Sequence, residues 1–311
     1  MNEKAKIDVD SGNPDWVDHA VLVYGPRKAG TTLFQNLLDG GQELLAYPAE
    51  LKLKAFVKYP LRGEAVSRYA QTSRVPEVNS RLLSIEGYRS SWRKAAERAD
   101  WHPDLRELIR LDAETVLENC GAKPSRLSLW CAKEVGGDTD KIVSLWRKMF
   151  PLGRILFIFR DPLMITRAVL NDRRRKGITL SAAEIAHETL DPLRVVAAQS
   201  RYLGDRDVFA LSYEDLVRDP RAVMARVASF LGIQMEDVFT RPTIFGEDVV
   251  VRTASRSDKE VFVEDREWFE GLTKREQFVV KATSRLSKVN PRYRLDYPQL
   301  RRAVAEGVRR P

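Results

Sequence analysis

The sequence predicts an α/β protein with three layers, in which a doubly wound parallel sheet lies between two layers of helices. Short apolar runs of strand length alternate with segments of helical periodicity, the pattern of parallel strands joined by helical crossovers. Three of these runs, 20–24, 155–159 and 208–212, lead directly into turn or helix-start residues. No internal repeat interrupts the alternation, so we expect right-handed connections between the strands.

The first unit pairs the apolar run at 20–24 with a helical pattern at 33–38. Two glycines at 40–41 supply the left-handed conformation in which helices commonly end. A second strand is expected at 43–47, with the sequence Pro-Ala-Glu as its end. This places Glu50 at the carboxyl end of a strand, the edge at which open parallel sheets bind ligands.

The long segment 52–126 has a mostly helical pattern. It contains one amphipathic helix, whose apolar residues are Leu105, Leu108, Ile109, Leu111, Val116 and Leu117. In an open α/β sheet, long connections beyond the strand ends shape the ligand crevice. We therefore expect this segment and the loop 252–259 to line the pocket of a variable substrate.

A second unit follows this segment. A helix is expected at 142–149 and a buried strand at 155–159. Asp161 and Pro162 come next, and they are typical of an N-cap and a first helical position. Arg160 is thus expected where the strand passes into the helix, at the ligand-binding edge of the sheet.

A third unit consists of the strand 208–212 and a helix that begins after the Asp-Pro pair at 219–220. Gly232 has the place of a residue that ends this helix. Near the C-terminus, Thr273 and Glu276 have the spacing of a capping box, which predicts a last helix.

Length and composition favour one large domain. The chain has 311 residues, of which 43% are hydrophobic and 31% charged, and we expect a single domain at 16–311 after a flexible segment at 1–15. Residues 1–8 are charged and lack the apolar core of a secretory signal, and the apolar runs fall far short of the ~20 residues of a membrane helix. We expect a cytoplasmic protein without stable membrane insertion, and the sequence does not indicate its oligomeric state.

The cysteine and histidine content and the net charge restrict the classes of function that the protein can have. Cys120 and Cys131 have no C-x-x-C spacing and the three histidines are scattered, so we expect free thiols and no metal site. A net charge of +8 suits a protein that handles a polyanionic nucleotide, and nucleic acid or an anionic surface is also compatible with it. Basic residues are dispersed except at 173–176 and in the C-terminal tail, which argues against a nucleic-acid-binding protein.

The most informative segment is Gly-Pro-Arg-Lys-Ala-Gly-Thr-Thr at 25–32, between the first strand and the first helix. Its glycines have the spacing of a P-loop, in which backbone N–H groups and a helix N-terminus cradle a phosphate. In nucleotide triphosphatases a lysine follows the second glycine, but Thr31 stands there in this chain and the cation is at Lys28. This displacement argues against ATP or GTP hydrolysis, and a P-loop kinase or nucleotide triphosphatase is kept as the alternative.

A loop of the form R-K-x-G-T-T after a first strand resembles the 5′-phosphosulfate-binding loop of sulfotransferases that use 3′-phosphoadenosine 5′-phosphosulfate (PAPS). The resemblance implies that Lys28 bridges the 5′-phosphate and the oxygen that links it to the sulfuryl group. The other residues that it implies for the cradle are Arg27, Ala29, Gly30, Thr31 and Thr32.

The sequence F-R-D-P resembles the 3′-phosphate-binding segment of the same family, which implies that Arg160 contacts that phosphate. The family usually carries a serine eight residues later, and this chain has Ala168 there. Thr166, Arg167 or the cluster 173–176 is expected to substitute. We favour Arg167, because a guanidinium forms the stronger bond to phosphate.

The stretch Y-E-D-L that starts at Tyr213, with F-L-G at the end of the following helix, resembles a third signature of the family and implies that Tyr213 lies near the nucleotide. For a general base, such families use a histidine or a glutamate. Glu50 is our first choice, since its position resembles the K-E motif of carbohydrate-modifying members, and His102 and Glu134 are the alternatives. Histidine titrates near neutrality by itself, whereas a glutamate needs burial to raise its pKa.

The resemblance therefore implies an enzyme that transfers a sulfuryl group from PAPS to an acceptor hydroxyl and releases adenosine 3′,5′-bisphosphate (PAP) without a metal. We expect a small-molecule or glycan acceptor. The resemblance covers the framework from about residue 20 to 290 and is specific at the three segments quoted.

Overall fold

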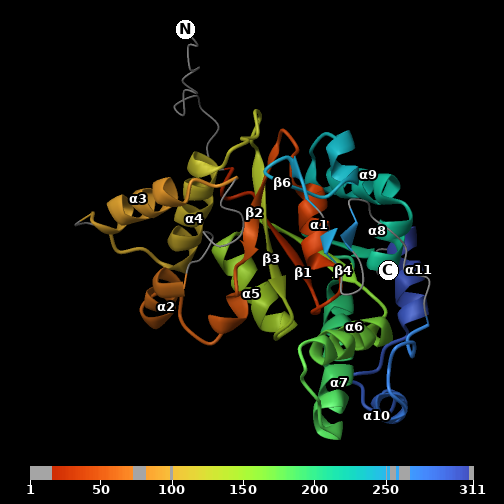
Figure 1. The fold of residues 1–311 in the computed structure, drawn as a ribbon. Coiled ribbons are helices and arrows are strands. Elements are labelled where there is room, and N and C mark those ends of the chain that lie inside the picture. The colour runs from red at the N-terminus through yellow and green to blue at the C-terminus, as the bar shows by residue number, and fades with distance from the viewer. Residues whose placement is uncertain are drawn as a thin grey trace.

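Five parallel strands form the central sheet in the order β2-β3-β1-β4-β5 (Figure 1). Their bounds are β1 Ala20–Gly25, β2 Leu44–Glu50, β3 Leu129–Val135, β4 Arg154–Phe159 and β5 Val208–Ser212. Val21 of β1 lies in register with Cys131 of β3 and with Arg154 of β4. The predicted parallel α/β sheet is confirmed.

The structure is a computed structural model that describes residues 16–72, 82–98, 101–249, 251–252, 257–258 and 267–307. The segment 1–15, which was predicted to be flexible, lies outside the described residues. So do residues 253–256 and 259 of the loop expected to line the substrate pocket.

Both faces of the sheet are covered, because β1 is buried along its whole length and its side chains alternate between two cores. Leu22 and Tyr24 face the first core and Val21 and Val23 the second. The first core is covered by α4 Leu105–Asn119, α5 Thr139–Met149 and α7 Ala182–Gln199. The second is covered by α1 Thr31–Leu38, α6 Pro162–Arg175, α8 Tyr213–Arg218 and α9 Pro220–Leu231.

Strand β3 is an element that the sequence pattern did not predict. It lies between β1 and β2, yet its apolar run of four residues gives way to Lys133 and Glu134 before the strand ends. Glu134 is fully buried. A charged pair at the end of a short apolar run is typical of a loop, and only the pairing with both neighbouring strands makes this segment part of the sheet.

A helical region lies beside β2 and β3 at one side of the sheet (Figure 1). It contains η1 Leu53–Ala55, α2 Glu64–Thr72 and α3 Ile85–Ala96, followed by α4. The buried carboxylate of Asp112 on α4 joins these elements, because it accepts hydrogen bonds from β2, α2 and α3. The mostly helical pattern predicted for 52–126 is therefore borne out in its described residues.

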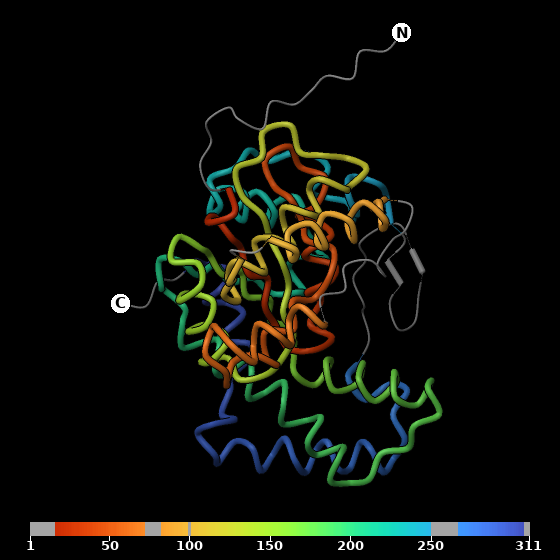
Figure 2. Tube along the Cα trace, turned by 90° about the vertical axis from the view of Figure 1, so that its left-hand side faces the viewer, coloured from red at the N-terminus to blue at the C-terminus, as the bar shows by residue number. Residues whose placement is uncertain are grey.

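A second helical group, made of α6, α7 and α10 Lys274–Ser287, lies below the sheet in both views (Figures 1 and 2). Leu170, Ile185, Leu272 and Val280 form its small core. The capping box at Thr273 and Glu276 is present, but it does not begin the last helix, since α11 Tyr297–Glu306 follows and packs beside β5. The remaining short elements are η3 Ser200–Tyr202, η4 Asp237–Thr240, β6 Thr243–Ile244, β7 Glu247–Asp248, β8 Val251–Arg252 and β9 Ser257–Asp258.

Candidate active site

The carboxyl ends of the five parallel strands lie at one edge of the sheet, and all three segments singled out in the sequence meet there. The loop 26–30 follows β1, Arg160 follows β4 and Tyr213 follows β5. Glu50 is the last residue of β2, as expected, and Glu134 is the last but one of β3. The topology thus brings together residues that are far apart in the chain.

The loop 26–30 leaves the N-terminus of α1 open. Lys28 and Gly30 both have a left-handed backbone, with φ of 66° and 99°. Gly30 is the N-cap of α1 and offers no side chain to the first-turn N–H groups, and that turn contains no acidic residue. Unpaired N–H groups and the positive end of the helix dipole make this point suitable for an anion.

Arg160 and Tyr213, which follow β4 and β5, both contact this loop. Arg160 Nη1 donates to the carbonyl oxygen of Lys28 at 2.9 Å, and its guanidinium lies 4.3 Å from the centre of the Tyr213 ring. A Cβ on Gly30 would lie 2.5 Å from Cδ2 of Tyr213, so the ring packs on the glycine itself. Glycine is required here both by its φ and by this close approach.

Glu214, the residue after Tyr213, joins the ends of β4 and β5. Its Oε1 accepts from the backbone N–H of Asp161 at 3.0 Å, and its Oε2 accepts from the Tyr297 hydroxyl at 2.5 Å. Asp161 is the N-cap of α6, as predicted, with Pro162 in the first turn. Burial raises the pKa of the Asp161 carboxyl.

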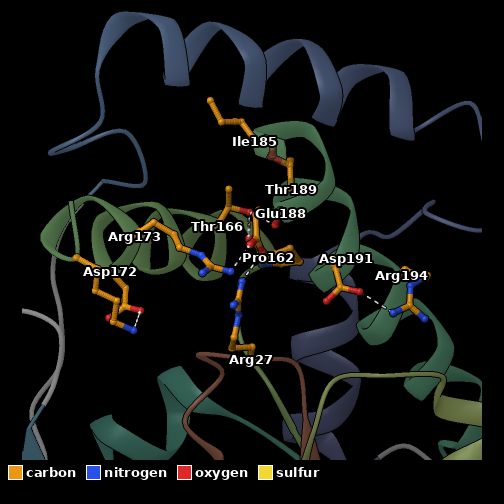
Figure 3. A network of polar contacts seen from close by, with 11 residues as sticks. Arg27, Pro162, Thr166, Asp172, Arg173, Ile185, Glu188, Thr189, Asp191 and Arg194 are labelled. Atoms are coloured by element: carbon orange, nitrogen blue, oxygen red, sulfur yellow. Dashed lines mark hydrogen bonds and ion pairs between the residues drawn. The ribbon is translucent and has the colours of Figure 1, made fainter. Parts of the chain in front are cut away.

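The two loop cations are paired with carboxylates of α6 and α7, and Figure 3 shows Arg27 reaching Glu188. The Arg27 guanidinium forms an ion pair with Glu188 of α7, and Lys28 Nζ lies 3.5 Å from Oδ1 of Asp172 on α6. Arg173 lies 3.5 Å from the other oxygen of Glu188. Both cations keep about a third or more of their side chains exposed, 42% for Arg27 and 35% for Lys28. A more highly charged anion in the cradle can therefore compete for them.

The basic cluster 173–176 ends α6 and is also engaged with acids. Arg175 and Lys176 pair with Asp172 at 3.0 and 2.9 Å, and Arg174 pairs with Glu276 of α10. Burial acts to raise the pKa of the Asp172 carboxyl, but Lys176 and Lys28 together hold this pKa below its ordinary value. Asp172 is therefore ionised opposite Lys28 at neutral pH.

A second group of charges lies at the ends of β2 and β3. Lys54 Nζ is 3.0 Å from Glu50 Oε1, 3.8 Å from Glu134 Oε1 and 3.0 Å from the carbonyl oxygen of Val135. Lys133, which lies opposite Glu50 in the sheet register, donates to Thr32 Oγ1 at 3.2 Å. Lys133 thus contacts the first turn of α1 and lies beside Glu50 in the sheet.

Burial shifts the pKa of two members of this group. The pKa of Glu134 rises to about 7, chiefly because its side chain is removed from water, and the pKa of Lys133 falls for the same reason. Both oxygens of Glu134 accept backbone N–H bonds, from Leu53 and from Val135. Glu134 has a pKa suited to a base, but its oxygens face the backbone of the protein, whereas Glu50 is partly exposed.

The other predicted site residues have different surroundings. Thr31 is buried and Thr32 exposed at the start of α1. The Arg167 side chain is buried on α6, and its Nε donates to the carbonyl oxygen of Glu270 at 2.9 Å. His102 is exposed in the segment before α4, and its side chain makes no hydrogen bond to a residue that the structure describes. Hydrogen bonds thus join Arg160 to the loop and Lys133 to the first turn of α1, whereas His102 takes no part in them.

Sequence reasoning missed several residues at this edge. Lys54, Asp172 and Glu188 contact predicted site residues, although none lies in a motif. The contact of Lys133 with Thr32 has no signal in the sequence, because it follows only from the central position of β3. The i,i+4 spacing of Lys54 to Glu50 is a feature of the sequence from which their ion pair could have been predicted.

The family model described as "Sulfotransferase family" matches residues 20–237, which include β1 to β5 and the three segments at the sheet edge. The chain belongs to the sulfotransferase family. The resemblance inferred from R-K-x-G-T-T, F-R-D-P and Y-E-D-L is thereby confirmed.

Two known proteins illustrate how distant the similarities are. This chain is 20% identical over 248 residues to protein-tyrosine sulfotransferase A of Caenorhabditis elegans, an alignment that covers 78% of this chain and 57% of that protein. The sulfotransferase domain from the Synechococcus PCC 7002 olefin synthase superposes with a TM-score of 0.52 at 17% identity, covering 85% of this chain and 93% of that domain. The latter similarity supports the α/β fold.

Among the residues with described positions, no three His, Cys, Asp or Glu side chains are placed to hold a metal ion. In the same part of the chain, no helix is both long and apolar enough to cross a membrane.

Proposed function

We propose that this sulfotransferase uses PAPS as sulfuryl donor and transfers the group to an acceptor hydroxyl. The observation that carries the proposal is the open N-terminus of α1, with Arg160 and Tyr213 packed on its loop and Lys28 and Lys133 beside it. This site offers N–H groups and cations to an anion but lacks a lysine directly after Gly30, where a triphosphatase needs it.

In the proposed reaction, the bond between the sulfur and the bridging phosphate oxygen breaks as a bond from the acceptor oxygen to sulfur forms. Lys28 neutralises the charge that develops on the bridging oxygen, and the first-turn N–H groups hold the phosphate, together with Arg27, Ala29, Gly30, Thr31 and Thr32. PAP is the product that leaves. As in phosphoryl transfer, positioning and placed charge do most of the work.

We assign Arg160 to the 3′-phosphate, with Arg167 as the favoured second group in place of the missing serine at Ala168. Arg160 is 8% exposed, so a phosphate that reaches it forms a charge-assisted bond away from bulk water. Tyr213 stacks on this guanidinium and lies beside the nucleotide in our proposal.

Glu50 is our candidate for the general base that takes the acceptor proton. It ends β2 at the same edge of the sheet as the cradle, and its carboxylate is accessible, unlike that of Glu134. His102 stays as the alternative. The acceptor class is proposed to be a small molecule or a glycan. The chain spans only 57% of protein-tyrosine sulfotransferase A, so we do not extend the tyrosine acceptor of that protein to this chain.

Calorimetric titration with PAP, and with ATP and Mg²⁺ as comparison, tests the donor site. We expect tight PAP binding, weak or no ATP binding, and at least tenfold weaker PAP binding by Arg160→Ala.

Lys28→Ala is expected to lower turnover of PAPS by ~10²-fold or more, as loss of an electrostatic stabiliser does in other enzymes, without change in the circular dichroism spectrum. Lys148→Ala, an exposed residue near the end of α5, is the matched control.

Preference for ATP over PAP would favour the kinase or triphosphatase alternative. Wild-type turnover by Lys28→Ala would contradict the role proposed for that residue.

Glu50→Gln tests the proposed general base and is expected to lower kcat by ~10²- to 10⁴-fold at neutral pH. A loss of this size in His102→Gln instead would assign the role of base to His102.

A further inference from the structure

The outward face of α10 exposes large apolar side chains. Phe278, Leu286 and Val289 are 73%, 71% and 83% exposed. At about 100° per residue, Phe278 and Leu286 fall within about 80° of each other around the helix axis, and Val289 lies in the turn directly after the helix. Of the six large hydrophobic residues that are exposed in the described part of the chain, four lie between 269 and 289. Apolar exposure is therefore concentrated on α10 and the residues next to its two ends.

The same face of α10 is strongly basic. Four exposed cations lie on it and a fifth, Lys288, follows at its C-cap. None forms an ion pair with another residue of the described segments, and Lys281 lies over the Trp268 ring. The four on the helix are Lys274, Arg275, Lys281 and Arg285. Glu276 is the sole acid between 274 and 289, and it points to the opposite side, where it pairs with Arg174 of α6. The outward face thus has a charge of +5 with no compensating acid on the helix.

The packing of α10 in the fold does not require exposed apolar and basic side chains on its outward face. α10 packs on α7 through its inner side, where Val280 joins Ile185 in a small core (Figure 3 shows α10 above Ile185). The family match ends at residue 237, well before α10. Neither packing nor the features shared across the family therefore explains three exposed apolar side chains among five cations.

The combination of apolar and basic side chains on this face indicates which kind of partner it binds. A second copy of the chain would bring two faces of like charge together, and a soluble polyanion would satisfy the cations but leave Phe278, Leu286 and Val289 in water. An anionic bilayer offers both partners: lipid phosphates attract Lys and Arg, whose long stems reach the headgroups, while the apolar side chains enter the acyl boundary.

We propose that the outward face of α10 docks the protein on the surface of a membrane that contains anionic lipids. The helix lies on the bilayer and does not cross it, which agrees with the absence of a spanning helix among the described residues. This docking does not depend on the identity of the sulfuryl donor or acceptor, because α10 contributes no residue to the candidate active site.

Cosedimentation of the full chain with vesicles tests the proposal. We expect binding to vesicles of phosphatidylcholine and phosphatidylglycerol to be at least tenfold tighter than to phosphatidylcholine alone, and to weaken with salt. Lys281→Glu combined with Arg285→Glu, and separately Phe278→Ser combined with Leu286→Ser, are each expected to weaken it at least tenfold. Leu152→Ser and Lys148→Glu, which change exposed residues elsewhere, are the matched controls and should bind as the wild type does.

Three results would overturn the docking proposal. The first is equal or no binding to the two kinds of vesicle. The second is loss of binding in the charge variant but not in the apolar variant, which would indicate a polyanion site. The third is a dimer in analytical ultracentrifugation that the apolar variant abolishes, which would assign the face to a second copy. PAP titration of the same variants should match the wild type, so failure of docking is distinguishable from failure of the donor site.

Discussion

At the scale of single residues, Glu134 shows how burial creates a titrating group in the physiological range. Its carboxylate is fully buried at the end of β3 and its pKa rises from an ordinary 4.5 to about 7. The folded protein therefore holds a proton here that the unfolded chain releases between these two values. The contribution of this group to stability is complete below pH 4.5 and is lost as pH rises through 7.

We predict that Glu134→Gln becomes more stable relative to the wild type as pH rises from about 5 to about 7, by up to ~1.4 kcal/mol per pH unit. Glutamine cannot ionise, so the variant escapes the cost of burying a charge. Urea unfolding at several pH values measures the difference. Glu118→Gln, an exposed residue on α4, should show no such trend. A constant difference for Glu134→Gln across this range would show that the carboxyl titrates normally.

At the scale of elements, Asp112 determines how the helical region meets the sheet. Its Oδ2 accepts from the hydroxyls of Tyr47 on β2 at 3.2 Å and Tyr69 on α2 at 2.5 Å. Its Oδ1 accepts from the Tyr88 hydroxyl at 2.5 Å and from Trp92 Nε1 at 2.6 Å, both on α3. Burial, followed by the charge of Asp112, raises the pKa of both Tyr47 and Tyr69, so these hydroxyls stay protonated and remain donors.

We expect Asp112→Ala to lower the free energy of unfolding by ~3 kcal/mol or more, because three buried hydroxyls and the half-buried Trp92 N–H lose their acceptor at once. Trp92→Phe removes one donor and should cost ~1 kcal/mol. Urea unfolding followed by circular dichroism gives both values, with Glu118→Ala on the same helix as control. If Asp112→Ala cost no more than the control, the network would not be what fixes α2 and α3.

At the scale of the whole molecule, the two cores share one sheet, and we predict that residues 16–311 unfold as one unit. Trp130 and Trp146 report on the first core, whereas Leu37 of α1 is buried in the second. Leu37→Ala should cost ~2 to 5 kcal/mol and shift the tryptophan fluorescence transition together with the circular dichroism transition. A fluorescence transition that stays in place would mean that the two cores unfold independently.

The sequence by itself determined the α/β class, the loop 26–30, the N-cap at Asp161 and the position of Glu50 at the end of β2, since each follows from local spacing or turn chemistry. Only the tertiary structure decided that β3 is a central strand, that Lys133 reaches Thr32, and that Asp172 and Glu188 face the loop cations. These contacts join residues more than a hundred positions apart, and their side chains carry no local pattern. Parallel pairing and helix packing place them, and neither leaves a trace in the spacing of the sequence.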